Sequence, residues 1–266
     1  MKFASTAAVA FAALSASAAV AQTLPAGISL NPALPATCSE SFLVGQLLGP
    51  LTKSCGLGDI LNVALTKPET FNSANSSLTF LDTLLHSQTF LPAMCSNDCN
   101  AALSTTASAF STNCGTTVPL LAPNASSPLP AQLSTLTAPD LAAVVTYGRN
   151  VICTKDGNSF CATTLFDAYK ASGMNNADMS KEICTPCGNN VLKAANQTAG
   201  LPASISSYVT AGLASDNQAL AQCTPEQLAG TTTAAAGTTT AKSSATQQTV
   251  GILSAAAAFA ASLVFA

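Results

Sequence analysis

Two cysteines three positions apart form the most chemically suggestive motif of the chain. Cys184-Thr185-Pro186-Cys187 has the C-x-x-C spacing of thiol–disulfide enzymes, in which a helix N-terminus lowers the pKa of the first thiol. An apolar helical pattern follows the motif, but the preceding segment NNADMSKEI is polar and does not fit the buried strand that such an enzyme places there. Because the chain holds eight further cysteines, structural disulfide bonding is the favoured interpretation.

Other candidates for chemistry are few. His86 is the single histidine, so a multi-histidine metal site is excluded and any Ser-His-Asp site would have to use it. Ser87 is adjacent in sequence but would face elsewhere on a helix, and no G-x-S-x-G motif occurs. Twelve carboxylates could include a glycosidase pair, but zero Trp and three Tyr count against a sugar cleft. We therefore expect no catalytic residue, no metal site and no cofactor.

The ten cysteines fall into two sets of five on either side of a proline-rich break. They are Cys38, Cys55, Cys95, Cys99 and Cys114, then Cys153, Cys161, Cys184, Cys187 and Cys223. An even count in a secreted chain predicts five disulfides, each contributing about 2–4 kcal/mol to stability. Each set has a close pair in third and fourth place, which suggests two pseudo-repeated halves, 38–118 and 135–223.

The spacing does not determine which cysteines pair. Cys153 and Cys161 flank the turn-rich stretch TKDGNSF and are the favoured local pair. Asp156-Gly157-Asn158 within it mimics part of a calcium loop, but the acidic ligand that should follow is missing, so a turn is predicted. Cys95 and Cys99 are four residues apart, so on one helix both would face the same neighbour.

Both ends of the chain carry targeting patterns. Lys2 precedes an apolar stretch and an A-x-A site at 19–21, which predicts a signal peptide over 1–21. Residues 250–266 are apolar and uncharged, with no Lys or Arg after them as a membrane span would have. With a polar spacer and a small-residue site at Gly237 or Ser243, they predict a GPI-attachment tail that is removed. A tail-anchored or single-span protein is the alternative.

Between these ends, residues 22–37 are proline-containing and uncharged, and we expect an extended leader. Residues 224–249, rich in Ala, Thr and Ser, predict an O-glycosylated stalk. Three sequons, at Asn75, Asn124 and Asn196, predict N-glycosylation on the surface.

Apolar residues recur at helical spacing through the cysteine-rich segment 38–223. Thr137-Ala138-Pro139-Asp140 is a good helix start, and strand alternation is hard to find. The pattern predicts an all-α, disulfide-stapled bundle of about six to nine short helices. Charged residues make up only 8% of the chain and Arg149 is the sole arginine, which leaves no basic face for nucleic acid.

The order of motifs resembles a known family. TCSESFLVGQLL, the CSNDC pair, YGRNVICTKDGNSFC, ICTPCGNNVL and a last lone Cys223 are similar to a fungal family of secreted ten-cysteine proteins of unknown function, usually GPI-anchored. The resemblance covers roughly 38–223 and implies a fungal surface protein. It implies no catalytic residues.

The sequence thus favours a non-enzymatic, GPI-anchored cell-surface or cell-wall protein. The plasma membrane is its expected partner through the lipid, and cell-wall polysaccharide is a second one. The alternative is a binding module for an apolar ligand such as a lipid or sterol, with a cavity lined by residues such as Phe80, Leu84, Phe166 and Tyr169. A third option is a surface enzyme with two carboxyls roughly 5–10 Å apart.

Overall fold

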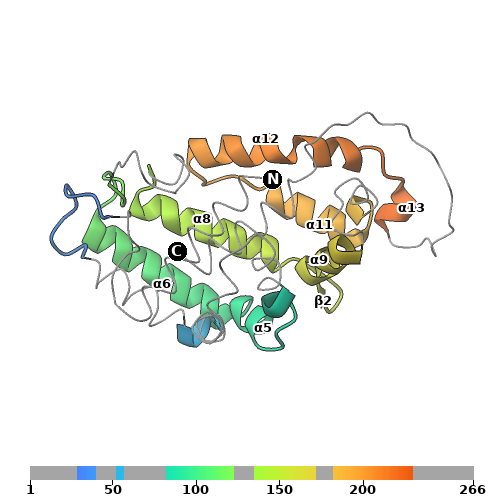
Figure 1. Cartoon of the computed structure of the whole chain (residues 1–266), viewed down its shortest axis with the longest axis horizontal. Helices are drawn as coiled ribbons and strands as arrows, with labels where there is room; N and C mark the ends of the chain where they lie inside the picture. The colour runs from blue at the N-terminus through green and yellow to red at the C-terminus, as the bar shows by residue number, and fades with distance from the viewer. Residues whose placement is uncertain (1–28, 40–51, 57–81, 123–134, 172–181, 230–266) are drawn as a thin grey trace. The chain divides into compact units, whose positions relative to one another are not determined.

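The computed structural model of the protein describes residues 29–39, 52–56, 82–122, 135–171 and 182–229 (Figure 1). These residues are mostly helical, and the helices are stapled by disulfides, as the sequence predicts. The predicted targeting segments 1–21 and 250–266 lie outside the described residues, as do Asn75, Asn124, Gly237 and Ser243.

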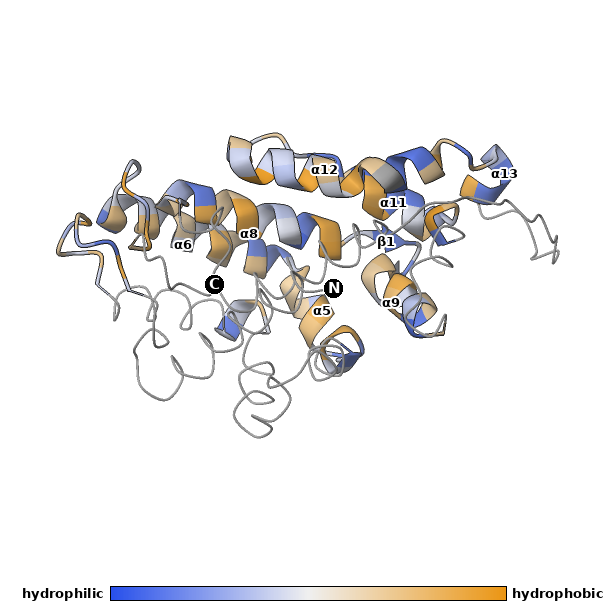
Figure 2. Ribbon diagram, turned by 45° about the horizontal axis from the view of Figure 1, so that its top comes forward, coloured by the Kyte–Doolittle hydropathy of each residue, from blue (hydrophilic) through white to orange (hydrophobic). Residues whose placement is uncertain are grey.

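The helices are α5 (Phe90–Met94), α6 (Asn97–Cys114), α8 (Ala138–Ile152), α9 (Cys161–Ala171), α11 (Pro186–Ala195), α12 (Ala203–Leu220) and α13 (Pro225–Leu228). The strands β1 (Lys155–Asp156) and β2 (Ser159–Phe160) pair in antiparallel register. Gly157 adopts a φ of +57° in the two-residue turn between them, so the predicted turn at Asp156-Gly157 is confirmed. Each longer helix carries both apolar and polar residues (Figure 2).

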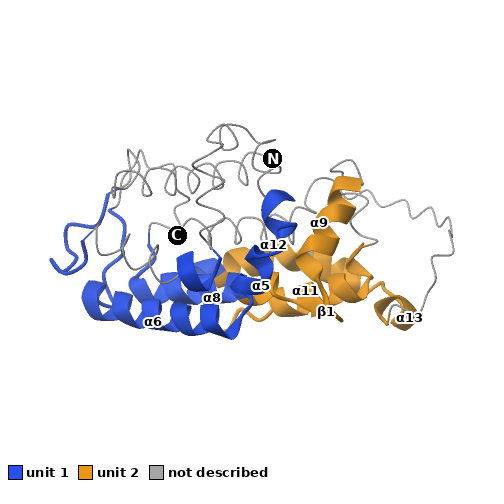
Figure 3. Ribbon diagram, turned by 90° about the horizontal axis from the view of Figure 1, so that it is seen from below, with its two compact units in different colours: residues 1–149, 200–205, 257–266 blue, residues 150–199, 206–256 orange. Residues whose placement is uncertain are grey.

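The chain divides into two compact units, of residues 1–149, 200–205 and 257–266 and of residues 150–199 and 206–256 (Figure 3). The proposed halves 38–118 and 135–223 remain a prediction. The disulfides Cys38–Cys114 and Cys55–Cys99 lie in the first unit, whereas Cys161–Cys187 and Cys184–Cys223 lie in the second.

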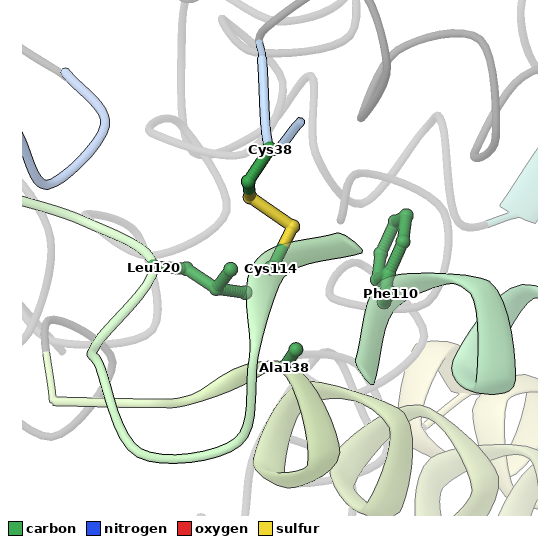
Figure 4. Close-up of a cluster of buried hydrophobic side chains, with 5 residues drawn as sticks. All are labelled: Cys38, Phe110, Cys114, Leu120 and Ala138. Atoms are coloured by element: carbon green, nitrogen blue, oxygen red, sulfur yellow. A yellow bond between two sulfur atoms is a disulfide. The ribbon is translucent and has the colours of Figure 1, made fainter. Parts of the chain in front are cut away.

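In the first unit, the Cys38–Cys114 disulfide joins the C-terminal end of α6 to residues 29–39. Cys38, Phe110, Cys114, Leu120 and Ala138 form a buried cluster (Figure 4). Leu30 and Leu34 of the expected leader pack against this cluster. The backbone N–H of Asn31 also donates to the Leu120 carbonyl at 3.0 Å, and Leu30 forms a β-bridge with Leu121. Residues 29–37 therefore pack on this unit through backbone pairing and apolar contact.

α8 begins as the sequence predicts. The Asp140 carboxylate accepts hydrogen bonds from the backbone N–H and the hydroxyl of Thr137, at 2.9 and 2.7 Å. Pro139 lies in the first turn, where its missing N–H costs no helical hydrogen bond.

In the second unit, α9 packs against α11, and the Cys161–Cys187 bridge joins the first turns of the two helices. The buried side chains of this unit include Leu165, Phe166, Val191, Leu192 and Leu213. Buried residues at helical spacing, such as Val191 and Leu192 in α11, form the core faces of these helices, as the helical spacing of apolar residues predicts. Among the helices in the described ranges, none combines the length and apolar character that a bilayer span requires.

Candidate functional site

The two close cysteine pairs occupy the same kind of turn. Cys95 follows α5 and precedes Ser96, the N-cap of α6, whereas Cys184 follows a helical turn at 182–183 and precedes Thr185, the N-cap of α11. We call Cys95-Ser96 and Cys184-Thr185 the cysteine–cap turns. In each, the cap residue's backbone N–H donates, at 3.1 Å, to a carbonyl three residues earlier. The cap hydroxyl accepts a hydrogen bond, also at 3.1 Å, from the N–H three residues later.

The second cysteine of each close pair lies in the first turn of the helix that follows. Cys99 bonds to Cys55 and Cys187 bonds to Cys161, so in both sets the second cysteine pairs with the fourth. Other bridges differ between the sets, because Cys38 pairs with Cys114 but Cys184 pairs with Cys223. The two sets therefore share a local element without sharing a complete connectivity.

Two of the expected cysteine arrangements are wrong. Cys161 pairs with Cys187 and not with Cys153, because the hairpin of β1 and β2 directs the chain into α9, which packs on α11. Cys95 and Cys99 do not share a helix, because the Ser96 cap separates them. All ten cysteines are disulfide-bonded, as the sequence predicts.

The C-x-P-C motif is at a helix N-terminus, but its two cysteines belong to separate disulfides. Cys184 is bonded to Cys223 and Cys187 to Cys161, so the two do not form the dithiol pair of a thiol–disulfide enzyme. The motif instead joins α11 to α9 and to the chain after α12. Its chemistry in this arrangement is that of a structural cross-link.

A glycine is required directly after this motif. Gly188 is buried in the first turn of α11, where a Cβ atom would overlap the Glu182 carbonyl oxygen and lie 2.6 Å from the Ile183 Cα. The Thr185 hydroxyl also donates to Glu182, at 2.6 Å, while it caps the Gly188 N–H. The turn before α11 thus packs directly on the helix backbone.

Arg149 is a buried cation for which the sequence alone predicts no role. It is 9% exposed, and its Nε and Nη2 groups donate to the carbonyls of Met94 and Ser96 at 2.9 and 2.8 Å. Burial lowers the pKa of its guanidinium. The signal was present in the sequence, because Arg149 lies four residues after Val145 and three before Ile152, on the buried face of α8.

The remaining candidates have local roles. The Nδ1 atom of exposed His86 lies 3.1 Å from the Asp82 carboxylate, one helical turn earlier. The Ser87 hydroxyl accepts the Phe90 N–H at 3.1 Å and so supports the start of α5. Asn196 is exposed and exchanges amide hydrogen bonds with Asn217 at 2.7 and 3.0 Å.

Of the residues expected to line an apolar cavity, Phe80 lies outside the described residues, Leu84 and Phe166 are core side chains of different units, and Tyr169 is partly exposed. No protein-family model, no curated protein and no solved structure matches this chain.

Proposed function

We propose that the protein is a non-enzymatic surface or wall protein, held outside the cell by a GPI anchor at its C-terminal end. The observation that carries the proposal is the complete pairing of ten cysteines. Disulfides at this density persist in oxidising, extracellular settings, and the cytosol would reduce them. The signal-peptide and lipid-attachment patterns of the sequence agree with that setting.

Four of the disulfides, Cys38–Cys114, Cys55–Cys99, Cys161–Cys187 and Cys184–Cys223, suit a protein that works in a harsh medium. They close loops with sequence separations of 76, 44, 26 and 39 residues. In the chain-entropy model each such loop destabilises the unfolded state by about 3–5 kcal/mol. Three of the four bridges have both cysteines buried, which protects them from external thiols. In this proposal the domain is a durable module displayed on the Ala/Thr/Ser-rich stalk.

Phospholipase C release from intact cells tests the anchor. We expect the protein to move from the detergent phase to the aqueous phase after treatment, because the enzyme removes the diacylglycerol part of the lipid. A variant that ends at residue 249 is the matched control, and we expect it in the medium without treatment. Release by wall-degrading glucanase alone would support transfer of the protein to wall polysaccharide. Protein that stays in the detergent phase after both treatments would overturn the anchor.

A further inference from the structure

The Cys184–Cys223 bridge differs in its exposure from three other bridges, Cys38–Cys114, Cys55–Cys99 and Cys161–Cys187. Both of its cysteines are partly exposed, whereas the six cysteines of those three bridges are 0–4% exposed. Cys223 lies just after α12, and its neighbours Ala221, Gln222 and Thr224 are all exposed. Because Cys223 is partly exposed within this exposed run, we take it as the cysteine that an external thiolate reaches first, and access is the first requirement for exchange.

The Cys184 sulfur, the other sulfur of this bridge, lies where its thiolate form is stabilised, which makes it a good leaving group. Cys184 directly precedes Thr185, the N-cap of α11, and the N-terminal end of a helix stabilises a nearby negative charge. Cys95 occupies the equivalent place before α6, and Cys95 and Cys153 are partly exposed too. However, neither of those two lies in an exposed run like that around Cys223.

We propose that Cys184–Cys223 is a thiol-sensitive clasp, which an extracellular low-molecular-weight thiol opens before the other bridges, and whose opening frees the C-terminal end of α12 from the start of α11. The loop that it closes holds α11 and α12, and the stalk segment follows it. The inference rests on the proposed extracellular location only for the source of the thiol.

The exchange runs in two balanced steps. A thiolate attacks the Cys223 sulfur, a mixed disulfide forms as the Cys184–Cys223 bond breaks, and Cys184 leaves as a thiolate. A second thiolate attacks the external sulfur of the mixed disulfide, and Cys223 leaves as a thiolate. The two external thiols have then become one disulfide, their two electrons have reduced the cysteine pair, and both cysteine thiolates take protons from water.

Graded reduction tests the order of opening. The folded full-length protein is exposed to reduced glutathione, trapped with N-ethylmaleimide at set times and mapped by peptide mass spectrometry. We expect Cys184 and Cys223 to be labelled at least about tenfold faster than the buried cysteines, because access limits exchange. Earlier labelling of any other pair, or simultaneous labelling of all ten cysteines, would overturn the clasp. Since this order is measured in solution, its failure leaves the phospholipase test untouched.

Hydrogen exchange tests the consequence of opening. In a Cys184→Ser/Cys223→Ser variant we expect faster amide exchange in α12 and unchanged exchange in α6, which has its own bridges at Cys99 and Cys114. If this variant does not fold, wild-type protein trapped with N-ethylmaleimide after the first opening supplies the same comparison. Unchanged exchange in α12 would show that the bridge does not restrain it.

Discussion

The Nε group of Arg149 donates a hydrogen bond to the carbonyl oxygen of Met94 at 2.9 Å, 55 positions away in the sequence. The same guanidinium reaches Ser96 through Nη2. One planar side chain of α8 therefore fixes both sides of the cysteine–cap turn at Cys95-Ser96. A buried arginine that binds carbonyls in this way is a structural element, since no other side chain offers the same fork of donors.

Replacement of Arg149 should weaken the fold strongly. We expect Arg149→Met to lower the free energy of unfolding by about 2–4 kcal/mol, because the buried Met94 carbonyl and the partly buried Ser96 carbonyl lose charged donors. Arg149→Lys keeps the positive charge but loses the forked arrangement of donors. We therefore expect its free energy of unfolding to lie between those of wild type and Arg149→Met. Denaturant unfolding of the oxidised proteins measures both, and an Arg149→Met variant as stable as wild type would show that the two hydrogen bonds contribute nothing net.

Two glycines in helices should respond in opposite ways to alanine. Gly188→Ala should destabilise the protein by about 2–3 kcal/mol or more, because its Cβ would meet the backbone of Glu182 and Ile183. Gly212→Ala, in α12, should stabilise it by up to about 1 kcal/mol, since nothing lies within 4 Å of its Cβ and alanine favours helix. Thermal unfolding gives the comparison. Equal effects at both positions would contradict the close packing at Gly188.

A buried hydroxyl in α6 offers a stabilising substitution. Thr106 is 4% exposed, and its Oγ1 atom has no hydrogen-bond partner in the described part of the chain. Thr106→Val replaces this hydroxyl with a methyl group of similar size, so we expect a gain of about 1 kcal/mol in unfolding free energy. Thr106→Ser keeps the hydroxyl and removes the methyl, and should lose stability. A loss in the valine variant would indicate that the hydroxyl is satisfied.

Tyr147 should make the fold sensitive to alkali. Burial raises the pKa of Tyr147 to about 12, from 10.0. Below pH 10 the hydroxyl is protonated in both states, so its contribution to stability is fully present. Between pH 10 and about 12 the unfolded chain loses the proton first, and the free energy of unfolding falls as pH rises.

Tyr147→Phe removes this titration, so its stability should fall less steeply across that range. Denaturant unfolding at a series of pH values measures the slopes, with peptide mapping to confirm that the bridges stay intact. The difference in absorbance at 295 nm between wild type and Tyr147→Phe should show an ionisation centred near pH 12 in the folded state. A midpoint at pH 10 would contradict the burial effect.

Helical spacing and cap residues predicted much of the fold. The Thr137–Asp140 start of α8 and the buried stripe of Val191, Leu192 and Ala195 follow from local rules, because a cap and an apolar face are encoded within a few residues. Disulfide pairing does not follow in this way. Cys161 lies eight residues from Cys153 yet bonds to Cys187, because the packing of α9 on α11 decides which sulfurs meet.

The same limit applies to the candidate sites. The C-x-P-C motif correctly indicated a helix start, but only the tertiary structure shows that Cys184 and Cys187 belong to separate bridges. The role of Arg149 needed the position of Met94, which no local pattern encodes. The close contact of Gly188 with the preceding turn is also one that no local sequence pattern encodes.

Mass spectrometry of the C-terminal peptide of protein isolated from cells is the most direct test of the GPI anchor. We predict a peptide that ends at Gly237 or Ser243 and carries ethanolamine phosphate and glycan, with residues 250–266 absent. Gly237→Gln and Ser243→Gln variants should identify which residue carries the lipid, because attachment needs a small residue at that position. A mature peptide that retains 250–266 without lipid would contradict the GPI anchor and favour a membrane span.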